Sequence, residues 1–348
     1  MSPPAVADRS TAEPRPLATH ARLPRLGFLG VGWIGRHRMT AMAAAGQVEV
    51  AALADASPEA LQQAHSLMPG AAVLGSFEEL LAQDLDGVVI ATPSALHAEQ
   101  AEKALARGLA VFCQKPMART AAECRRVIAA ARQSDRLLGV DLSYRHTAAM
   151  RRIRERVAAG DVGEVYAVDL VFHNAYGPDK PWFRDPALSG GGCVIDLGIH
   201  LVDLALWTLD FPSVREVSSR LFAQGRRLEP GNDRVEDFAT AQFDLDTGAV
   251  VRLACSWNLA AGRDAVIEAT FHGTRGGLSM RNAAGSFYDF VAERFDGTRS
   301  MPVAEPPDDW GGQAAVAWAR ALAEGARFDP AIECIANVAD VLDAIYGR

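Results

Sequence analysis

The chain has 348 residues, more than one ordinary hydrophobic core contains, so we expect two domains. It carries 35 lysines and arginines against 43 aspartates and glutamates, a net charge of −8. This acidic balance disfavours nucleic acid and anionic membranes as partners, because both attract basic surfaces. Hydrophobic residues make up 49% of the chain, which is enough for a packed core. No apolar run reaches the roughly 18 residues that a membrane-spanning helix needs.

The five cysteines are widely spaced and include no Cys-x-x-Cys pair. This pattern argues against a disulfide framework and against a zinc ribbon. We therefore expect reduced thiols in a cytoplasmic protein. Residues 1–24 are rich in proline and lack the apolar centre of a signal peptide, so we expect a disordered or extended arm there.

Short apolar runs alternate with alanine-rich segments over residues 25–146. The runs are bounded by turn residues, as strands buried on both faces should be: Arg25–Gly30, Val48–Asp55, Asp86–Thr92, Leu109–Gln114 and Leu137–Leu142. Capping signals begin helices between them, at Ser57-Pro58, at Ser76 with Glu79, and at Thr120 with Glu123. This alternation predicts a doubly wound parallel sheet, the α/β class.

The pattern changes in residues 147–348, where apolar residues recur with a period of two. Five segments have this period in whole or in part: Val165–Phe172, Val214–Phe222, Phe238–Leu245, Ala249–Trp257 and Ala265–Phe271. Such strands predict a largely antiparallel sheet with one face covered and one face open. Helical patterns return at 312–324 and 331–346, and these helices could pack back on the first domain. We therefore expect a C-terminal α+β domain.

A glycine-rich loop follows the first predicted strand. It reads Gly30-Val31-Gly32-Trp33-Ile34-Gly35, which is G-x-G-x-x-G between a strand and a helix. The first glycine permits the turn, the second lets the backbone approach a pyrophosphate, and the third lets helix and strand pack closely. Asp55 ends the second strand, where its carboxylate can bind both ribose hydroxyls. The loop predicts a dinucleotide-binding site, and Asp55 favours NAD, with NADP possible. The alternative interpretation is a plain glycine turn.

Two further loops lie where predicted strands end, the edge at which open α/β sheets bind ligands. The first loop contains Thr92 and Pro93, with His97 just after it. Thr92, Pro93 and His97 are cofactor-binding candidates, although Thr92 and Pro93 also suit a helix start. The second contains Gln114 and Lys115, which are cofactor-binding candidates as well. The ammonium of Lys115 could bind a substrate hydroxyl beside a nicotinamide, or it could be a solvated surface lysine.

A glycine run at 190–192 leads into an apolar helix that carries Asp196 and His200. Four residues apart on an α-helix, these two side chains share one face. Three interpretations compete: a proton-transfer pair, a metal site and a structural pair. A metal site would have only two ligands here, so we expect no metal. We expect Asp203 to make a helix-surface or inter-element contact.

Together these motifs resemble the family of glucose–fructose oxidoreductase, inositol dehydrogenase and MocA, which are NAD(P)-dependent oxidoreductases. The resemblance covers about residues 25–348 and is carried by the glycine loop, Ala91-Thr92-Pro93, Gln114-Lys115-Pro116, and the glycine run through Asp196 and His200. It implies a Rossmann domain and a second domain whose open sheet builds a homodimer or homotetramer. It also implies hydride transfer to or from a sugar, polyol or related hydroxy compound.

The resemblance places the catalytic lysine at Lys115 and the catalytic aspartate and histidine at Asp196 and His200. One departure is that the family's Glu-Lys-Pro motif has Gln114 in place of the glutamate, which removes a charge beside Lys115. In the oxidation of an alcohol, the cofactor takes the hydride and the protein orients and deprotonates the hydroxyl. We expect His200 to be the general base, Asp196 its support and Lys115 the polarising group.

Five more side chains are candidates to line the substrate pocket: Tyr144, Arg145, His173, Trp182 and Arg184. A rival interpretation is a non-catalytic, dinucleotide-sensing protein of the same fold. The presence of Lys115, Asp196 and His200 together favours catalysis. Reduction of an imine or a tetrapyrrole-like substrate is a third possibility, and it would make less use of His200 as a base.

Overall fold

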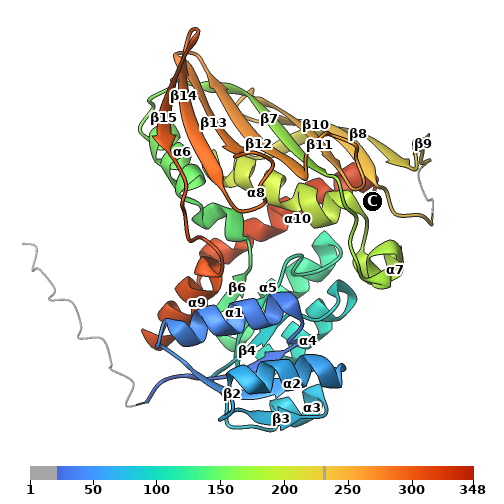
Figure 1. The fold of residues 1–348 in the computed structure, drawn as a ribbon, viewed down its shortest axis with the longest axis vertical. Helices are drawn as coiled ribbons and strands as arrows, with labels where there is room; N and C mark the ends of the chain where they lie inside the picture. Colours follow the sequence, from blue (N-terminus) through green and yellow to red (C-terminus); the bar gives the residue numbers. More distant parts are fainter. Residues whose placement is uncertain (1–21, 230–232) are drawn as a thin grey trace, which may run out of the picture.

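The computed structural model describes residues 22–229 and 233–348. Figure 1 shows two sheets with helices packed between and around them. The nine-stranded sheet lies at the top of the view, and the parallel sheet lies at the bottom among α1 to α5. Most of the predicted arm, residues 1–21, lies outside the described residues.

The N-terminal half forms a six-stranded parallel sheet with strand order β3-β2-β1-β4-β5-β6. Its strands are β1 (Arg25–Leu29), β2 (Glu49–Ala54), β3 (Ala72–Leu74), β4 (Gly87–Ile90), β5 (Ala110–Cys113) and β6 (Leu138–Val140). Its helices are α1 (Trp33–Ala44), α2 (Pro58–Leu67), α3 (Phe77–Leu81), α4 (Ser94–Ala106) and α5 (Ala121–Ser134). The predicted doubly wound sheet is confirmed.

Three of these helices begin where the sequence predicts. The hydroxyls of Ser57, Ser76 and Thr120 each accept a hydrogen bond from the backbone N–H three residues later. Each cap satisfies one of the N–H groups that a helix start leaves free. The starts of α2 and α3 are thereby fixed on either side of β3, an edge strand that the sequence analysis did not predict.

The C-terminal half forms a nine-stranded mixed sheet with order β15-β14-β13-β12-β7-β11-β10-β8-β9. Its strands are β7 (Val165–Asn174), β8 (Val214–Ala223), β9 (Arg226–Arg227), β10 (Phe238–Leu245), β11 (Val250–Ser256), β12 (Ala265–Gly273), β13 (Gly276–Asn282), β14 (Phe290–Asp296) and β15 (Arg299–Ala304). All neighbours are antiparallel except β7 and β11, which run parallel. The expected largely antiparallel sheet is confirmed, and the strands from β13 to β15 are additional to the prediction.

Helices cover one face of this sheet (Figure 1). They are α6 (Ala148–Ala158), α8 (Ile199–Thr208) and α10 (Cys334–Tyr346), and the short α7 (Pro186–Ser189) lies at one end. Their apolar side chains and the inner face of the sheet share one core, which includes Phe243, Phe271 and Leu253. The residues of β10 alternate between buried and exposed, so the other face of the sheet is open within the described residues.

The last two helices also contact the N-terminal half. α9 (Gln313–Ala323) packs on α1, where Trp318 contacts Phe112 of the parallel sheet with ring centroids 5.7 Å apart. α10 packs on α5 as well as on α8 and β8. α10 therefore joins the two halves of the chain, whereas α9 belongs to the core of the parallel sheet.

One described stretch, Pro186–Thr208, is long enough and on average apolar enough to cross a membrane, although Asp196, His200 and Asp203 interrupt its apolar run. It includes α7, a π-helical turn at Val194–Gly198, and α8. Of its most apolar window, 83% is buried inside the fold. Its hydrophobicity is therefore that of a core helix packed under the nine-stranded sheet.

Candidate active site

The three glycines of the loop after β1 have three different surroundings. Gly30 has a φ of +84°, and a Cβ there would lie 2.5 Å from the carbonyl oxygen of Ala91. A Cβ at Gly35 would lie 2.1 Å from the carbonyl oxygen of Gly30. A Cβ at Gly32 would meet nothing within 4 Å. The first and third glycines thus permit close packing, and the second leaves open space at the start of α1, as a bound pyrophosphate requires.

The N-terminus of α1 is suited to binding an anion. Gly32 caps the helix without a side-chain hydrogen bond, and the first turn has no acidic residue. The free N–H groups and the helix dipole both attract negative charge there. Together with the open space at Gly32, this arrangement fits the pyrophosphate of a dinucleotide.

Asp55 fixes the same loop. Its Oδ2 accepts a hydrogen bond from Val31 N–H at 2.6 Å, and its Oδ1 accepts one from Ser57 N–H at 2.8 Å. The carboxylate therefore joins the glycine loop to the start of α2. Each oxygen retains a lone pair, so the predicted ribose contact and this structural contact are compatible.

A cavity of about 730 Å³ opens beside the glycine loop, at the carboxyl edge of the parallel sheet. Most of the predicted cofactor residues line it: Gly32, Trp33, Ile34, Thr92, Pro93, His97, Gln114 and Lys115. Gly30, Gly35 and Asp55 are not among its lining residues. The C-terminal half supplies the opposite wall: Asp179, Lys180, Trp182, Phe183, Ser189, Ile195 and Asp196. The cavity therefore lies between the two halves of the chain and is lined by both.

His97 connects two loops of this cavity. It is 1% exposed, and its Nδ1 and Nε2 lie 2.7 Å from the carbonyl oxygens of Pro116 and Thr92, respectively. It thus links the loop after β4 to the loop that carries Lys115. The sequence analysis named His97 as a cofactor contact, and the structure gives it this bridging position as well.

Lys115 and Asp196, which both line the cavity, form an ion pair. The ammonium Nζ of Lys115 donates to Asp196 Oδ1 at 2.7 Å and to the main-chain oxygen of Asp196 at 2.7 Å. Both side chains are 17% exposed, so the pair is largely shielded but reaches the cavity. The lysine comes from the parallel sheet and the aspartate from the glycine run, 81 positions apart. The sequence analysis named both residues without predicting this ion pair.

Asp196 lies on a π-helical turn, Val194–Gly198, that precedes α8. The sequence analysis assumed α-helical spacing, which would place Asp196 over His200. In the described residues no hydrogen bond joins the two; Asp196 Oδ1 accepts from Lys115 Nζ, and Oδ2 accepts from Trp257 Nε1 at 3.0 Å. The π-turn changes the angular spacing of residues four apart. The expected Asp196–His200 pair is therefore replaced by an Asp196–Lys115 pair.

His200 is 7% exposed and lies against Tyr144, with ring centroids 4.8 Å apart. Its Nδ1 is buried without a hydrogen-bond partner among the described residues. Burial, and then the positive charges of Lys115 and Arg38, lower the pKa of His200 well below its usual range. The imidazole is therefore neutral near pH 7.

Most of the other predicted substrate residues lie outside the cavity lining. Only Trp182 lines the cavity, stacked on Phe183 with centroids 3.8 Å apart. Arg145 is engaged by the carboxylate of Asp203, with its Nε 2.8 Å from Oδ2. Asp203 is 1% exposed, so its contact is an inter-element ion pair and not a helix-surface contact. Burial of Asp203, opposed by the charge of Arg145, raises the pKa of this carboxyl.

His173, Tyr144 and Arg184 do not line the cavity either. His173 Nδ1 lies 2.8 Å from Ser256 Oγ, and its ring stacks on Phe238. Tyr144 is 8% exposed and packs in an aromatic cluster with His200. Arg184 is exposed. Their expected substrate contacts remain predictions.

Trp257 is a site residue that the sequence analysis missed as a functional candidate. It follows β11, is 3% exposed, and holds Asp196 through its indole N–H. The predicted strand ended at Trp257, so the period-two pattern marked it only as a core residue. No local motif connects position 257 with position 196, and only the fold brings them together.

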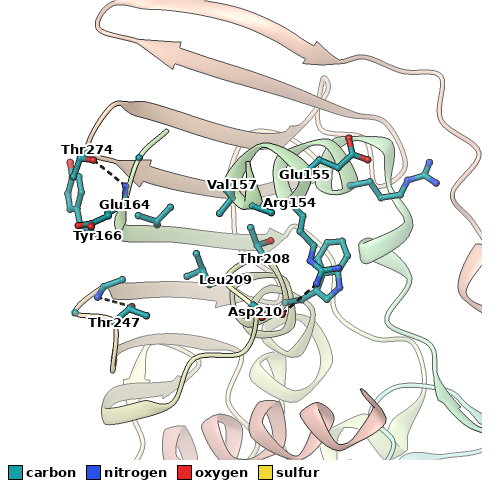
Figure 2. A pocket seen from close by; sticks show the side chains of 17 residues that line it. Arg154, Glu155, Val157, Glu164, Tyr166, Thr208, Leu209, Asp210, Thr247 and Thr274 are labelled. Carbon is teal, nitrogen blue, oxygen red and sulfur yellow. Dashed lines mark hydrogen bonds and ion pairs between the residues drawn. The ribbon is translucent and has the colours of Figure 1, made fainter. Parts of the chain in front are cut away.

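A second cavity, of about 1160 Å³, is lined only by residues of the C-terminal half (Figure 2). It is lined by α6, the end of α8 and the turns of the nine-stranded sheet, and it contains Arg154 stacked on Trp207. None of the predicted catalytic or cofactor residues lines it. In the described residues no group of three or more histidine, cysteine, aspartate or glutamate side chains could hold a metal ion. The cavity between the two halves is therefore the candidate active site.

Comparisons with known proteins agree with this arrangement. A family model described as "Oxidoreductase family, NAD-binding Rossmann fold" matches residues 24–142. A second, described as "GFO/IDH/MocA C-terminal domain", matches residues 150–279. The two models cover the parallel sheet and much of the nine-stranded sheet.

Individual proteins are similar over different lengths. D-glucoside 3-dehydrogenase of Escherichia coli (strain K12) is 29% identical over 58% of this chain, and the aligned part spans 60% of that protein. The dTDP-3,4-didehydro-2,6-dideoxy-alpha-D-glucose 3-reductase of Streptomyces violaceoruber is 30% identical over 86% of each chain. The crystal structure of GenD2 from gentamicin A biosynthesis, in complex with NAD, has a TM-score of 0.79 at 26% identity and covers 96% of each chain.

Proposed function

Because the chain belongs to the GFO/IDH/MocA family of oxidoreductases, we propose that it is an NAD(P)-dependent dehydrogenase or reductase of a sugar or polyol. The reaction we propose is hydride transfer between the nicotinamide and a secondary alcohol or ketone. Two relatives are named for position 3 of a glucose derivative. We therefore propose a hexopyranose derivative as the substrate class and the carbon at position 3 as the reacting centre.

One observation carries this proposal: the Lys115 ammonium, held by Asp196, lies in the same cavity wall as the glycine loop. When bound there, the nicotinamide would supply the hydride chemistry. The loop backbone and the start of α1 would bind the pyrophosphate, and Asp55 would bind the ribose. In the reduction, Lys115 Nζ would donate its proton to the substrate oxygen, and in the oxidation it would take that proton back.

Asp196 keeps Lys115 in place for that exchange. Its carboxylate and its main-chain oxygen both accept hydrogen bonds from Nζ, and this fixes the direction in which the Nζ–H groups point. His200 is neutral near pH 7, which is the form that a general base requires, so the role predicted for it from the sequence is the alternative to proton uptake by Lys115 in the oxidation. Without a carboxylate partner, a protonated His200 would be poorly stabilised, and this favours Lys115 as the proton donor.

The wall from the C-terminal half suits a sugar ring. Trp182 and Phe183 present aromatic faces, and Asp179 and Lys180 add polar groups beside them. Aromatic rings pack on the apolar faces of sugars, and charged groups bind their hydroxyls. The experiment is a panel of hexopyranosides and polyols with NAD⁺ or NADP⁺, and of the 3-keto derivatives with NADH or NADPH, followed by the absorbance of the reduced cofactor. Turnover of hexopyranosides supports the proposal, and NADH binding without turnover of any member contradicts it and favours the sensor.

We further propose that the protein assembles through the open face of the nine-stranded sheet and works in the cytoplasm. The face has no covering helix among the described residues, and it presents polar side chains such as Gln242 and Arg252. The five cysteines are free, as a reducing compartment keeps them. Sedimentation equilibrium tests the assembly: a dimer or tetramer supports it, and a monomer at micromolar concentration contradicts it.

A further inference from the structure

Two side chains from distant parts of the chain hold the glycine run before Asp196. Glu236, which is 2% exposed, immediately precedes the loop into β10, and Tyr346 ends α10. The Glu236 carboxylate accepts hydrogen bonds from Gly192 N–H, at 3.0 Å to each oxygen, and from Val194 N–H at 2.9 Å. The Tyr346 hydroxyl donates to Glu236 Oε1 at 2.8 Å. The carboxylate thus accepts hydrogen bonds from three groups at the start of the π-turn.

The hydroxyl of Tyr346 also accepts a hydrogen bond, from Ile195 N–H at 3.2 Å. Ile195 directly precedes Asp196, whose main-chain oxygen and carboxylate both bind Lys115. The position of the ammonium therefore depends on the backbone at residues 195 and 196, not only on one side-chain rotamer. A shift of this backbone would move both acceptors of Lys115 at once.

The same contacts explain why the run consists of glycines. A Cβ at Gly191 would lie 2.1 Å from the Tyr346 hydroxyl oxygen, and a Cβ at Gly192 would lie 1.9 Å from the main-chain oxygen of Glu236. Cys193 N–H donates to that same oxygen at 3.0 Å. Glu236 and Tyr346 therefore lie directly against the backbone of the run, with no space for a side chain between.

We propose that Glu236 and Tyr346 are positioning residues, which fix the backbone at 192–196 and through it the Lys115 ammonium at the cofactor cavity. The inference rests on the proposed function, because it assigns the two residues an effect on the proton exchange at Lys115 Nζ. Neither residue lines the cavity, so they act through Asp196 and do not contact substrate or cofactor.

The first test is Tyr346→Phe, assayed with the hexopyranoside that the wild-type protein turns over fastest. Loss of the hydroxyl removes two hydrogen bonds, the one from Ile195 N–H and the one to Glu236 Oε1. We expect kcat per NADH-binding site to fall roughly tenfold, because part of the lost hydrogen-bond energy is felt at Lys115. KM and the NADH dissociation constant should stay within about twofold, because the cavity lining is unchanged. The matched control is Tyr166→Phe, which removes an exposed hydroxyl on β7 and should leave kcat unchanged.

A double-mutant cycle separates positioning from general stability. In an Asp196→Asn background, Tyr346→Phe should lower kcat by less than about twofold, because the group through which it acts is already altered. Glu236→Gln, which keeps the shape of the side chain, should behave in the same way. An equal loss in both backgrounds, or an unchanged kcat in the wild-type background, overturns the inference.

A crystal structure of Tyr346→Phe provides a readout that needs no substrate. We expect Lys115 Nζ and Asp196 Oδ1 to lie farther apart than the 2.7 Å of the wild-type structure. An unchanged pair in the folded variant overturns the positioning role. If the wild-type protein turns over no member of the panel, the proposed function fails, whereas this distance still decides the inference about Glu236 and Tyr346.

Discussion

The indole N–H of Trp257 donates a hydrogen bond to Asp196 Oδ2 at 3.0 Å, on the side of the carboxylate opposite Lys115. Asp196 is thereby held between Trp257, which follows β11, and Lys115, which follows β5. An acidic group with both oxygens engaged has little freedom to rotate, and this holds the ammonium at one place in the cavity wall.

Replacing the indole tests this relationship. Trp257→Phe keeps an aromatic ring and removes the N–H, so Asp196 Oδ2 loses its donor. We expect kcat to fall roughly ten- to a hundredfold, with NADH affinity retained, because a single hydrogen bond to a charged group is lost. Steady-state kinetics beside a fluorescence titration of NADH measures both quantities. A kcat equal to that of the wild-type protein would show that Asp196 is held without Trp257.

Asp55 should determine cofactor affinity. In Asp55→Ala, Val31 N–H and Ser57 N–H both lose their acceptor, and the predicted ribose contact is lost as well. We expect the NADH dissociation constant to rise at least about tenfold and the preference for NAD over NADP to weaken. Asp84→Ala, at a position 84% exposed, is the control. Unchanged affinity in Asp55→Ala would exclude the ribose contact.

His200 gives a prediction about pH and stability. Its folded-state pKa is lowered by burial, whereas the unfolded imidazole protonates near pH 6.5. The unfolded state therefore binds more protons below about pH 6.5, and the free energy of unfolding falls as the pH falls. His200→Gln lacks this pH-dependent contribution. The amount by which the variant's free energy of unfolding lies below that of the wild type should therefore be smaller at pH 5 than at pH 7, by up to ~1.4 kcal/mol per pH unit. Urea unfolding at both pH values measures it.

The control for this series is Gln242→Ala, on the exposed side of β10. It removes no ionisable group, so its effect on the free energy of unfolding should be the same at both pH values. A His200→Gln effect that is the same at both pH values would mean that the folded protein protonates this imidazole as readily as the unfolded chain does.

The buried ion pair of Arg145 and Asp203 should matter for stability and not for catalysis. Arg145→Met leaves the Asp203 carboxylate buried without its partner, which typically costs about 3–5 kcal/mol. The double variant Arg145→Met with Asp203→Leu should recover most of that loss, because the uncompensated charge is gone. Denaturant unfolding of the two variants measures the difference, and a single variant as stable as the double would contradict this interpretation.

The parts of the fold that the sequence predicted are those governed by local rules. The glycine loop, the caps at Ser57, Ser76 and Thr120, and the buried strands each depend on a few neighbouring residues. β3 was missed because it is three residues long and mostly exposed, so it lacks an apolar run. β13 to β15 were missed because residues 276–304 combine adjacent glycines with exposed, charged positions, which hide the period of two.

The candidate site was predicted as a set of residues but not as a set of contacts. Lys115 and Asp196 were named from motifs, whereas their contact depends on how the two sheets meet. Asp196 was paired with His200 because α-helical spacing was assumed, and a π-turn cannot be read from hydrophobic spacing. Arg145 was placed at the pocket from its position after a strand, and only the fold shows that Asp203 engages it.

The central claim is that the Lys115 ammonium exchanges a proton with the substrate oxygen beside the nicotinamide. The most direct measurement is kcat of Lys115→Ala, per NADH-binding site, beside Lys103→Ala on the surface of α4 as the control. We predict a loss of about 10²- to 10⁴-fold, larger than in His200→Gln, with NADH affinity largely retained. Full turnover by Lys115→Ala, with the cofactor bound as in the wild-type protein, would contradict the account.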